Sequence, residues 1–309
     1  MKILTLSEAL KRRYHTKVYK LSLSSGCTCP NRDGTLGTGG CTFCSAGGSG
    51  DFAADPAPLG EQLAAAKALV DPKFPKHIAP EGRRYIAYFQ SYTNTYVRSG
   101  AELARLQALY REAIARPEIV GLAVGTRPDC LPDPVLDMLA DLNRVKPVWV
   151  ELGLQTVHEA TAEAFHRGYP LEVFESAYRR LADAGIPAVV HVILGLPGET
   201  RAMMLETVDT LANLSPILPG IKLQLLHVLK GTAMGEAYLK DPFPVFTLEA
   251  YTDLVVDCLK RLPESTVVHR LTGDAPKRLL IAPKWSANKR LVLNTLRAKI
   301  ARAERPGSN

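Results

Sequence analysis

The chain has 309 residues, of which 46% are hydrophobic and 22% charged, and these proportions favour a folded protein with a large core over a disordered one. Its longest apolar stretch, near Ile186–Pro197, contains His191 and is shorter than the ~20 residues of a membrane-spanning helix. The chain opens with a short apolar patch followed by a basic run, which is not the order of a signal peptide. We therefore expect a cytoplasmic protein with no membrane partner.

The net charge of +7 is unevenly distributed along the chain. Residues 1–26 carry six basic side chains against the single acidic Glu8, and residues 265–309 carry ten basic side chains against two acidic ones. The part between them is net acidic. Basic ends on an acidic body favour a polyanionic partner such as tRNA. A merely solvated basic surface is the alternative that charge alone leaves open.

Apolar segments alternate with segments of helical period along most of the chain, which is typical of repeated βα units around a parallel sheet. The predicted strands cover 17–25, 83–90, 119–126, 147–154, 187–196 and 221–228. The helices predicted between them cover 100–115, 134–143, 171–184 and 199–214. Six such units form either a partial barrel or a doubly wound sheet. In both folds the functional residues gather at the carboxyl ends of the strands.

The C-terminal part of the chain departs from this alternation. A helix is predicted over 248–262, a possible strand over 266–271 and a basic amphipathic helix from about Asn288. We expect residues 1–264 to form the barrel and residues 265–309 to form a basic extension packed on it.

The cysteines are few and clustered, since four of the six lie between Cys27 and Cys44. In a chain of this length that favours a metal or redox site over a disulfide scaffold. The segment reads CTCPNRDGTLGTGGCTFC, so Cys29, Cys41 and Cys44 form a C-x11-C-x2-C pattern with Cys27 just ahead. Its glycines permit a tight loop, and it directly follows the first predicted strand, where an active site is expected.

Two kinds of site fit this cysteine segment. Three thiolates on a four-iron cube leave one iron open, to which S-adenosylmethionine could bind through its amino and carboxylate groups. A zinc ion held by all four cysteines is the alternative. The position at a strand end favours the cluster and makes Cys27 a packing residue.

With these residues in view, the sequence resembles the radical SAM superfamily, within it the elongator-like group and its small bacterial YhcC/YtqA-type subgroup. The motifs that carry the resemblance are TCPNRDGTLGTGGCTFC, FQSYTNTY, GTRPDC, ELGLQT followed by HRGY, VHVILGLPGET, and HRLTGD with APKW. They extend over nearly the whole chain. The resemblance implies an α/β fold, a partial (β/α)6 TIM-like barrel. It also implies a [4Fe-4S] cluster on Cys29, Cys41 and Cys44, and S-adenosylmethionine as the second cofactor.

The resemblance also implies roles for residues that bind the cofactor. Gln155, at the end of the fourth predicted strand, resembles the residue that hydrogen-bonds the ribose of S-adenosylmethionine. Arg167 resembles the cation that meets the carboxylate. The chain lacks the Gly-Gly-Glu motif that many members have after the second strand, and Gln90 and Ser91 are the candidates for holding the amino group.

Other polar residues follow predicted strands and are candidates to face the barrel interior, where each could also be a satisfied structural group. They are Arg127, Asp129, Glu151, His191 and His227.

The resemblance and the basic termini together favour an enzyme that abstracts hydrogen from tRNA during modification of the wobble uridine. Such an enzyme needs a reducing partner such as flavodoxin or ferredoxin. Two alternatives stay open: a radical enzyme that acts on a small metabolite or a protein, and a non-enzymatic, zinc-stabilised RNA-binding protein.

Overall fold

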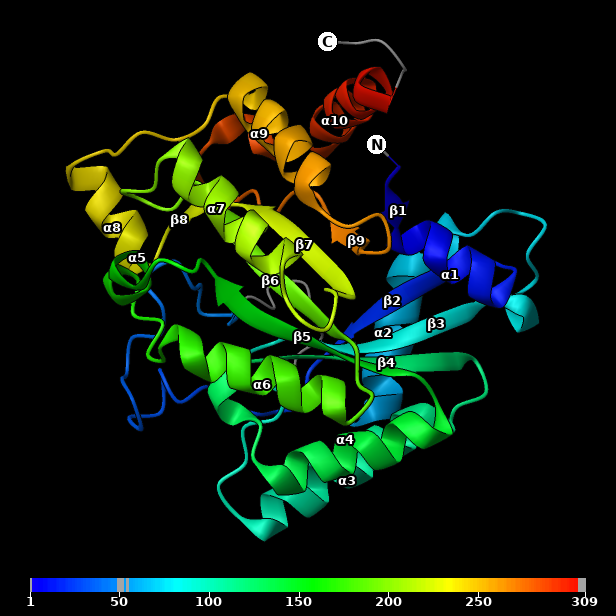
Figure 1. Ribbon diagram of the computed structural model, residues 1–309. Helices are drawn as coiled ribbons and strands as arrows, with labels where there is room; N and C mark the ends of the chain where they lie inside the picture. The colour runs from blue at the N-terminus through cyan, green and yellow to red at the C-terminus, as the bar shows by residue number, and fades with distance from the viewer. Residues whose placement is uncertain (1, 49–52, 54–55, 305–309) are drawn as a thin grey trace.

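Eight parallel strands form one curved sheet at the centre of the protein, as Figure 1 shows for the computed structural model, which describes residues 2–48, 53 and 56–304. The strand order is β1-β9-β7-β6-β5-β4-β3-β2. The strands are β1 (Leu4–Thr5), β2 (Val18–Leu23), β3 (Arg84–Phe89), β4 (Ile119–Thr126), β5 (Val148–Gln155), β6 (Ala188–Leu194), β7 (Gly220–Leu225) and β9 (Val267–Arg270). A separate antiparallel pair consists of β8 (Val228–Leu229) and β10 (Leu280–Ala282).

The register of the sheet aligns the carboxyl ends of its strands. Leu23 of β2 pairs with Phe89 of β3, Phe89 pairs with Val124 of β4, and Val124 pairs with Val150 of β5. Because all these strands are parallel, the loops that follow them emerge at one edge of the sheet.

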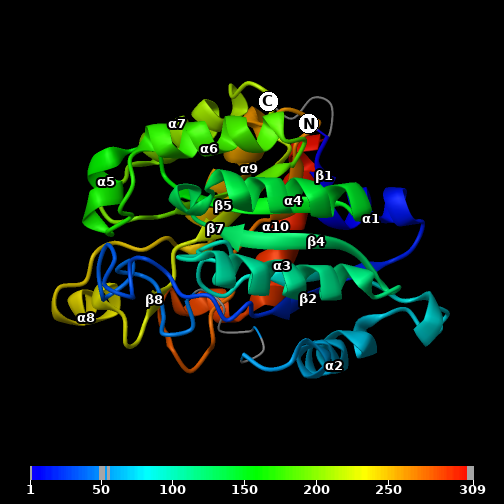
Figure 2. The same cartoon turned by 90° about the horizontal axis from the view of Figure 1, so that it is seen from below.

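Helices cover the outer face of the sheet in Figures 1 and 2. On α6 the buried residues Phe174, Ala177, Tyr178 and Leu181 recur every three or four positions, the spacing of one apolar helix face. The helices are α1 (Leu6–Tyr14), α2 (Leu59–Val70), α3 (Gly100–Ala115), α4 (Asp133–Val145), α5 (Glu159–Ala164), α6 (Leu171–Asp183), α7 (Arg201–Ala212), α8 (Ala233–Lys240), α9 (Leu248–Arg261) and α10 (Lys289–Glu304). Short 3₁₀ turns occur at Asp71–Lys73, Pro80–Gly82, Pro128–Cys130 and Lys284–Ala287.

Helix α1 lies at the amino end of the barrel, opposite the loops that follow the strands (Figures 1 and 2). It begins with a capping box, in which the Thr5 side chain accepts from the Glu8 backbone and the Glu8 carboxylate accepts from the Thr5 backbone. Its buried Leu10 packs with Val18, Trp149 and Val189 of the sheet. The helix therefore closes this end of the barrel.

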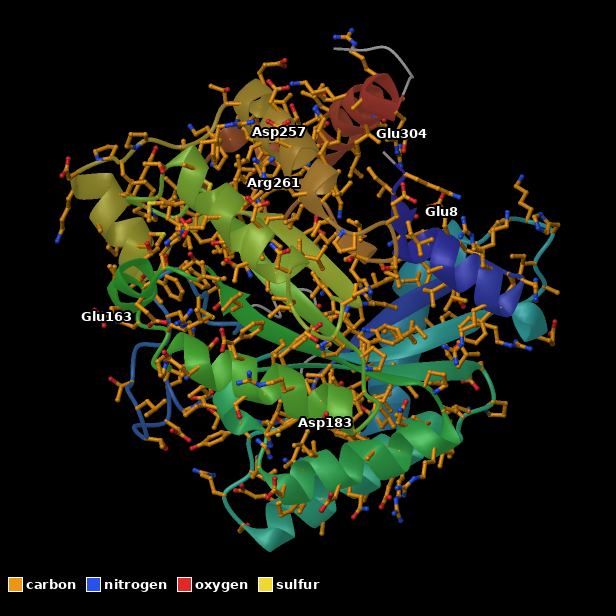
Figure 3. All side chains as sticks on the ribbon, in the orientation of Figure 1. Glu8, Glu163, Asp183, Asp257, Arg261 and Glu304 are labelled. Atoms are coloured by element: carbon orange, nitrogen blue, oxygen red, sulfur yellow. The ribbon has the colours of Figure 1, made fainter. Side chains whose placement is uncertain are left out.

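The outer helices α7 and α9 pack side by side, and ion pairs join their exposed faces. Arg261 lies 3.1 Å from Asp209, and Arg201 pairs with Asp257; Figure 3 labels Asp257 and Arg261. Such exposed pairs contribute little to stability, so burial of apolar side chains holds this layer.

The last helix is also packed onto the barrel. Val292 and Leu296 of α10 are buried, and the Trp285 indole N–H donates to the Phe246 carbonyl at 2.8 Å. The Trp285 ring lies 5.9 Å from that of Tyr251 on α9.

The partial α/β barrel predicted from the sequence is confirmed, with two differences in its sheet. The possible strand near 266–271 is β9, which together with β1 brings the sheet to eight strands, so part of the predicted extension 265–309 completes the sheet. The predicted strand 221–228 ends at Leu225, because the chain turns there before β8 pairs with β10. None of the described helices is long and apolar enough to cross a bilayer.

Candidate active site

A cavity of about 260 Å³ opens at the carboxyl ends of the strands. Its walls come from the cysteine loop (residues 27–44) with Ser45 and Gly48 just after it, and from strands β3 to β7 with their following turns. Arg167 and Tyr169 after α5, Leu229 of β8 and the segment 270–274 complete them. The lining includes Cys29, Arg32, Cys41, Cys44, Tyr88, Gln90, Tyr92, Arg127, Glu151, Gln155, Arg167, Tyr169, His191, Lys222, Gln224, His227, Leu229, Arg270 and Asp274.

The structure separates the four clustered cysteines into two groups. Cys29, Cys41 and Cys44 are half-buried and line the cavity. Cys27 is buried in the main hydrophobic core, where an Arg105 nitrogen is 3.9 Å from its sulfur. Only the first three sulfurs therefore face the space that a cofactor would fill.

The cysteine loop is held on both sides by backbone contacts. The Asn31 side-chain amide donates to the His166 carbonyl at 2.7 Å, and the Thr42 N–H donates to the Phe165 carbonyl at 3.0 Å. On the other side, the Met234 N–H at the start of α8 donates to the Thr42 carbonyl at 2.8 Å. The loop is thus tied to its neighbours on both sides by hydrogen bonds.

Two glycines are needed where the loop folds against Arg32 and Tyr92. Arg32 donates to the Cys44 and Ser45 carbonyls at 2.9 and 2.6 Å and lies over the Tyr92 ring. Gly40 has φ +75°, and a Cβ there would come within 2.8 Å of Arg32 Nε. A Cβ at Gly48, with φ +59°, would come within 2.3 Å of the Tyr92 ring. Larger residues would displace both side chains.

The donor set of this loop fits an iron-sulfur cluster better than a single zinc ion. Three cysteines line one cavity while the fourth, Cys27, lies in the core, so the loop offers three thiolates to a ligand and not the closed set of four that structural zinc prefers. Thiolates on a [4Fe-4S] cube bind three different irons, so they need not meet at one point. Burial raises the pKa of the Cys41 thiol to about 12, so metal binding must displace its proton.

Gln155 presents a free side chain to the cavity. It ends β5 in the left-handed conformation, with φ +68°, beside a register irregularity between β5 and β6. Its side chain lines the cavity and makes no hydrogen bond with the described residues. The amide can therefore both donate to and accept from a ligand.

Arg167 holds the turn around Gln155. One of its terminal nitrogens donates to the carbonyls of Leu154 and Thr156 at 3.3 and 2.8 Å, on either side of Gln155. Its other groups donate to the Tyr169 carbonyl and to the Glu159 carboxylate, both at 2.8 Å. Four of its five N–H groups are thus bonded within the chain, and the side chain is 1% exposed. One N–H is left for a ligand.

The two candidates after β3 have different surroundings. Gln90 lines the cavity, whereas Ser91 is buried and is not part of its lining. The next residues support the strand ends, since Asn94 accepts from the Ser25 hydroxyl at 2.7 Å and donates to the Gly125 carbonyl at 2.9 Å.

Four residues of the cavity lining are linked to one another and to Lys20, which is not part of the lining. We call these five side chains the Glu151 cluster: Lys20, Tyr88, Glu151, His191 and Lys222. One Glu151 oxygen lies 2.5 Å from the Lys20 ammonium. The other contacts the Lys222 ammonium and lies 3.1 Å from His191 Nε2. Lys222 also donates to the Tyr88 hydroxyl at 3.0 Å. The Glu151 side chain has no exposed surface.

Burial and charge oppose each other in the Glu151 cluster. Burial raises the pKa of Glu151, but the charges on Lys20 and Lys222 outweigh it, and the pKa lies well below its usual value. Burial lowers the pKa of Lys222 well below its usual value, although Glu151 opposes this. Burial and the Lys222 charge lower the pKa of His191 to about 4. The base of the cavity thus holds one carboxylate among several hydrogen-bond donors.

The structure brings most of the strand-end candidates to the cavity. Arg127, Glu151, His191 and His227 line it. Asp129 does not, and instead accepts from Arg127 at 2.9 and 2.7 Å.

Sequence reasoning missed Lys20, Tyr88 and Lys222. A signal was available, because Lys20 and Lys222 are charged residues inside otherwise apolar strands, which is uncommon unless they are paired.

Comparison with known families decides the class of this protein. Residues 28–211 match the Radical SAM superfamily, and residues 218–302 match the Radical_SAM C-terminal domain. The chain belongs to the radical SAM superfamily. As a radical SAM enzyme it uses a [4Fe-4S] cluster and S-adenosylmethionine, and the alternative of a non-enzymatic zinc protein is not supported.

Relatives of this radical SAM enzyme include small bacterial proteins. It is 43% identical to the uncharacterized protein YtqA of Bacillus subtilis, over 96% of this chain and 88% of YtqA. It is 39% identical to protein YhcC of Escherichia coli K12, over 91% of this chain and 86% of YhcC. These matches agree with the subgroup expected from the motifs.

More distant relatives belong to the elongator-like group. The tRNA uridine(34) acetyltransferase of Methanocaldococcus infernus is 23% identical over 54% of this chain and 31% of its own length. The solved structure of the Elp3 protein of that archaeon, lacking N-terminal residues, superposes with a TM-score of 0.64 and 15% identity. That match covers 91% of this chain and 63% of the archaeal one and shows that the fold is shared.

Proposed function

We propose that this radical SAM enzyme modifies tRNA at the wobble uridine by removing a hydrogen atom from carbon. The observation that carries the proposal is the relationship to a relative named as a tRNA uridine(34) acetyltransferase. The cavity supports it, because the cysteine loop lies at its mouth and a cluster of polar side chains lies at its base. A substrate held between them would be surrounded by protein.

The residues of this chain that would hold the cofactors come from four places around the cavity. We assign the cluster to Cys29, Cys41 and Cys44, and the ribose of S-adenosylmethionine to Gln155. Gln90 is our candidate for the amino group, since Ser91 lies outside the lining. When bound, the two cofactors supply a 5′-deoxyadenosyl radical that abstracts hydrogen.

Arg167 would meet the cofactor carboxylate through its one remaining N–H, while its other four hold the turn at Gln155. The Glu151 cluster would orient the substrate, because His191 and Lys222 both line the cavity and carry N–H groups. We further propose that the enzyme acts in the cytoplasm and receives its electron from a flavodoxin or a ferredoxin.

The test is mass spectrometry of tRNA nucleosides from cells that lack the protein. We expect loss of one modified uridine, or accumulation of its precursor, restored by the wild-type gene but not by Cys41→Ala. The matched control is Cys258→Ala, which changes a cysteine on the buried face of α9 and should restore the modification. An unchanged nucleoside profile would refute the tRNA proposal and favour a metabolite or protein substrate.

A further inference from the structure

Two of the five cations on the C-terminal helix α10, Lys289 and Lys299, form ion pairs within the protein. Lys289 lies 2.5 Å from Asp274. Lys299 lies 2.7 Å from Glu249 and 2.5 Å from Asp253, both on the neighbouring α9. The helix is therefore a weaker candidate for a polyanion surface than its sequence suggests.

A second group of cations is not engaged in this way. We call residues 228–232 and 275–285 the β8–β10 ribbon; it carries Lys230, Lys277, Arg278 and Lys284 and no acidic residue. All four cations are exposed, and none forms an ion pair or a side-chain hydrogen bond within the described part of the chain. The ribbon thus presents about four uncompensated charges to solvent.

The β8–β10 ribbon borders the cavity through Leu229, while its four cations lie outside the lining. Leu229, next to Lys230, is part of the cavity lining, and Lys230 N–H donates to the Leu279 carbonyl, one residue beyond Arg278, at 2.7 Å. The chain then enters α8, whose Met234 N–H binds Thr42 of the cysteine loop. In Figures 1 and 2, β8 and α8 lie toward the end of the barrel that carries this loop.

We propose that the β8–β10 ribbon is the RNA-docking surface of this enzyme and binds the phosphates that flank the nucleotide in the cavity. The inference rests on the proposed function. An enzyme that acts on a base must take that base out of its stack, and the backbone then stays at the mouth of the pocket. Phosphates held there need cations, and exposed Lys and Arg bind them by releasing counterions.

The chain offers a control surface with the same number of exposed cations at the other end of the barrel, with the exposed Glu8 among them. Lys2, Lys11, Arg12 and Arg13 are exposed, and the last three belong to α1, which closes the amino end (Figure 1). If charge alone attracted RNA, both surfaces would bind it, and removing the cations of either one would weaken binding.

The experiment replaces all four ribbon cations by Gln and compares tRNA binding with that of the wild type and of the fourfold α1 variant. The anaerobically reconstituted full chain is titrated with labelled tRNA between 50 and 300 mM salt. We expect the ribbon variant to bind about ten-fold more weakly or worse at 0.1 M salt. The slope of log K against log salt should also fall by about 3 for four lost contacts with a single-stranded loop. The α1 variant should behave like the wild type.

Three outcomes are distinguishable. Equal loss in both variants, or loss only in the α1 variant, would overturn the ribbon as the docking surface while leaving the tRNA proposal intact. A wild-type enzyme that does not bind tRNA, together with an unchanged nucleoside profile, would overturn the function itself. If iron content or circular dichroism shows that the fourfold variant is misfolded, the double variant Lys277→Gln/Arg278→Gln carries the test, with about half the change in slope expected.

Discussion

Glu151 is a carboxylate that cannot be removed without leaving other charges unsatisfied. It is fully buried and shared by Lys20, Lys222 and His191. Taking charges out of water is costly, and here each ammonium is compensated mainly by this one group.

We therefore predict that Glu151→Gln lowers the free energy of unfolding by about 3–5 kcal/mol, the usual result of breaking a buried ion pair from one side. Urea unfolding measures it. The matched control is Glu118→Gln, which removes the partner of Lys67 at a half-exposed site and should cost less than about 1 kcal/mol. Similar losses in both variants would show that the Glu151 cluster is hydrated rather than desolvated.

Arg167 gives a second prediction at the scale of one side chain. Arg167→Lys keeps the positive charge but cannot hold the carbonyls of Leu154 and Thr156 together, so Gln155 should lose its orientation. We expect affinity for S-adenosylmethionine to fall about ten-fold, or about 1.4 kcal/mol, with the iron content unchanged.

The control for this prediction is a double-mutant cycle with Gln155→Ala. Equilibrium dialysis measures the affinity for S-adenosylmethionine. The change that S-adenosylmethionine causes in the electron paramagnetic resonance spectrum of the reduced cluster provides a second measurement. Effects of the two substitutions that are not additive would mean that Arg167 acts through Gln155. Additive effects would show that Arg167 contacts the cofactor independently.

At the scale of elements, α1 shows how much stability an N-terminal capping box contributes to a helix. Leu6, Leu10 and Tyr14, spaced four residues apart, form the face of α1 that packs on the sheet, and Leu10 is its one fully buried residue. Its start is defined by the reciprocal bonds of Thr5 and Glu8.

We predict that Thr5→Ala destabilises the protein by about 1 kcal/mol, the usual effect of losing an N-cap. The comparison is Ser265→Ala, an exposed residue whose side chain makes no hydrogen bond within the described ranges, which should have no measurable effect. Denaturation midpoints provide the measurement. If both midpoints stay at the wild-type value, the capping box does not hold α1.

Strong periodicity explains which elements were predictable. Strand β4 and helix α3 have the predicted bounds, because a buried parallel strand is a continuous apolar run and α3 begins at the Ser99 cap. Helices α1 and α2 were missed, since the first was interpreted as a charged terminus and the second, rich in alanine, follows a long loop. Strand β1 has only two residues and exists because β9 is beside it.

The site was predictable only where residue type limits the chemistry. Three cysteines after a strand indicate a metal centre, and the structure places all three in the cavity wall. The role of Arg167 as a clamp was not predictable, because it depends on carbonyls that a turn brings together 11 and 13 residues away. Directly bonded partners in the Glu151 cluster lie up to 134 positions apart in the sequence, which no local pattern reveals.

At the scale of the whole molecule, three partly buried histidines make stability depend on pH. Burial lowers the pKa of His191 and of His227 to about 4, and it lowers that of His269 well below its usual value. Each is neutral when folded but takes up a proton near pH 6.5 when unfolded. The unfolded state therefore binds more protons between about pH 6.5 and 4, and stability must decrease as the pH falls through that window.

We predict that the free energy of unfolding falls by about 2 kcal/mol for each of His191 and His227 between pH 7 and pH 5. Urea unfolding at the two pH values measures it. His227→Gln should reduce this pH dependence by its own share, whereas His77→Gln, at an exposed position, should leave it unchanged. A stability that is flat over this range would mean that these histidines are protonated in the folded protein.

The first strand of the sheet pairs with the last one in sequence, since within the described residues β1 pairs with β9 and β9 also pairs with β7. During synthesis, residues 4–5 therefore wait for residues 267–270 to leave the ribosome before they find their partner. Until then β7 is an open edge that other chains could pair with. A protein shortened at residue 264 would keep its cysteines but would lack β9, so β7 would stay an open edge. The C-terminal segment therefore determines when the sheet is complete.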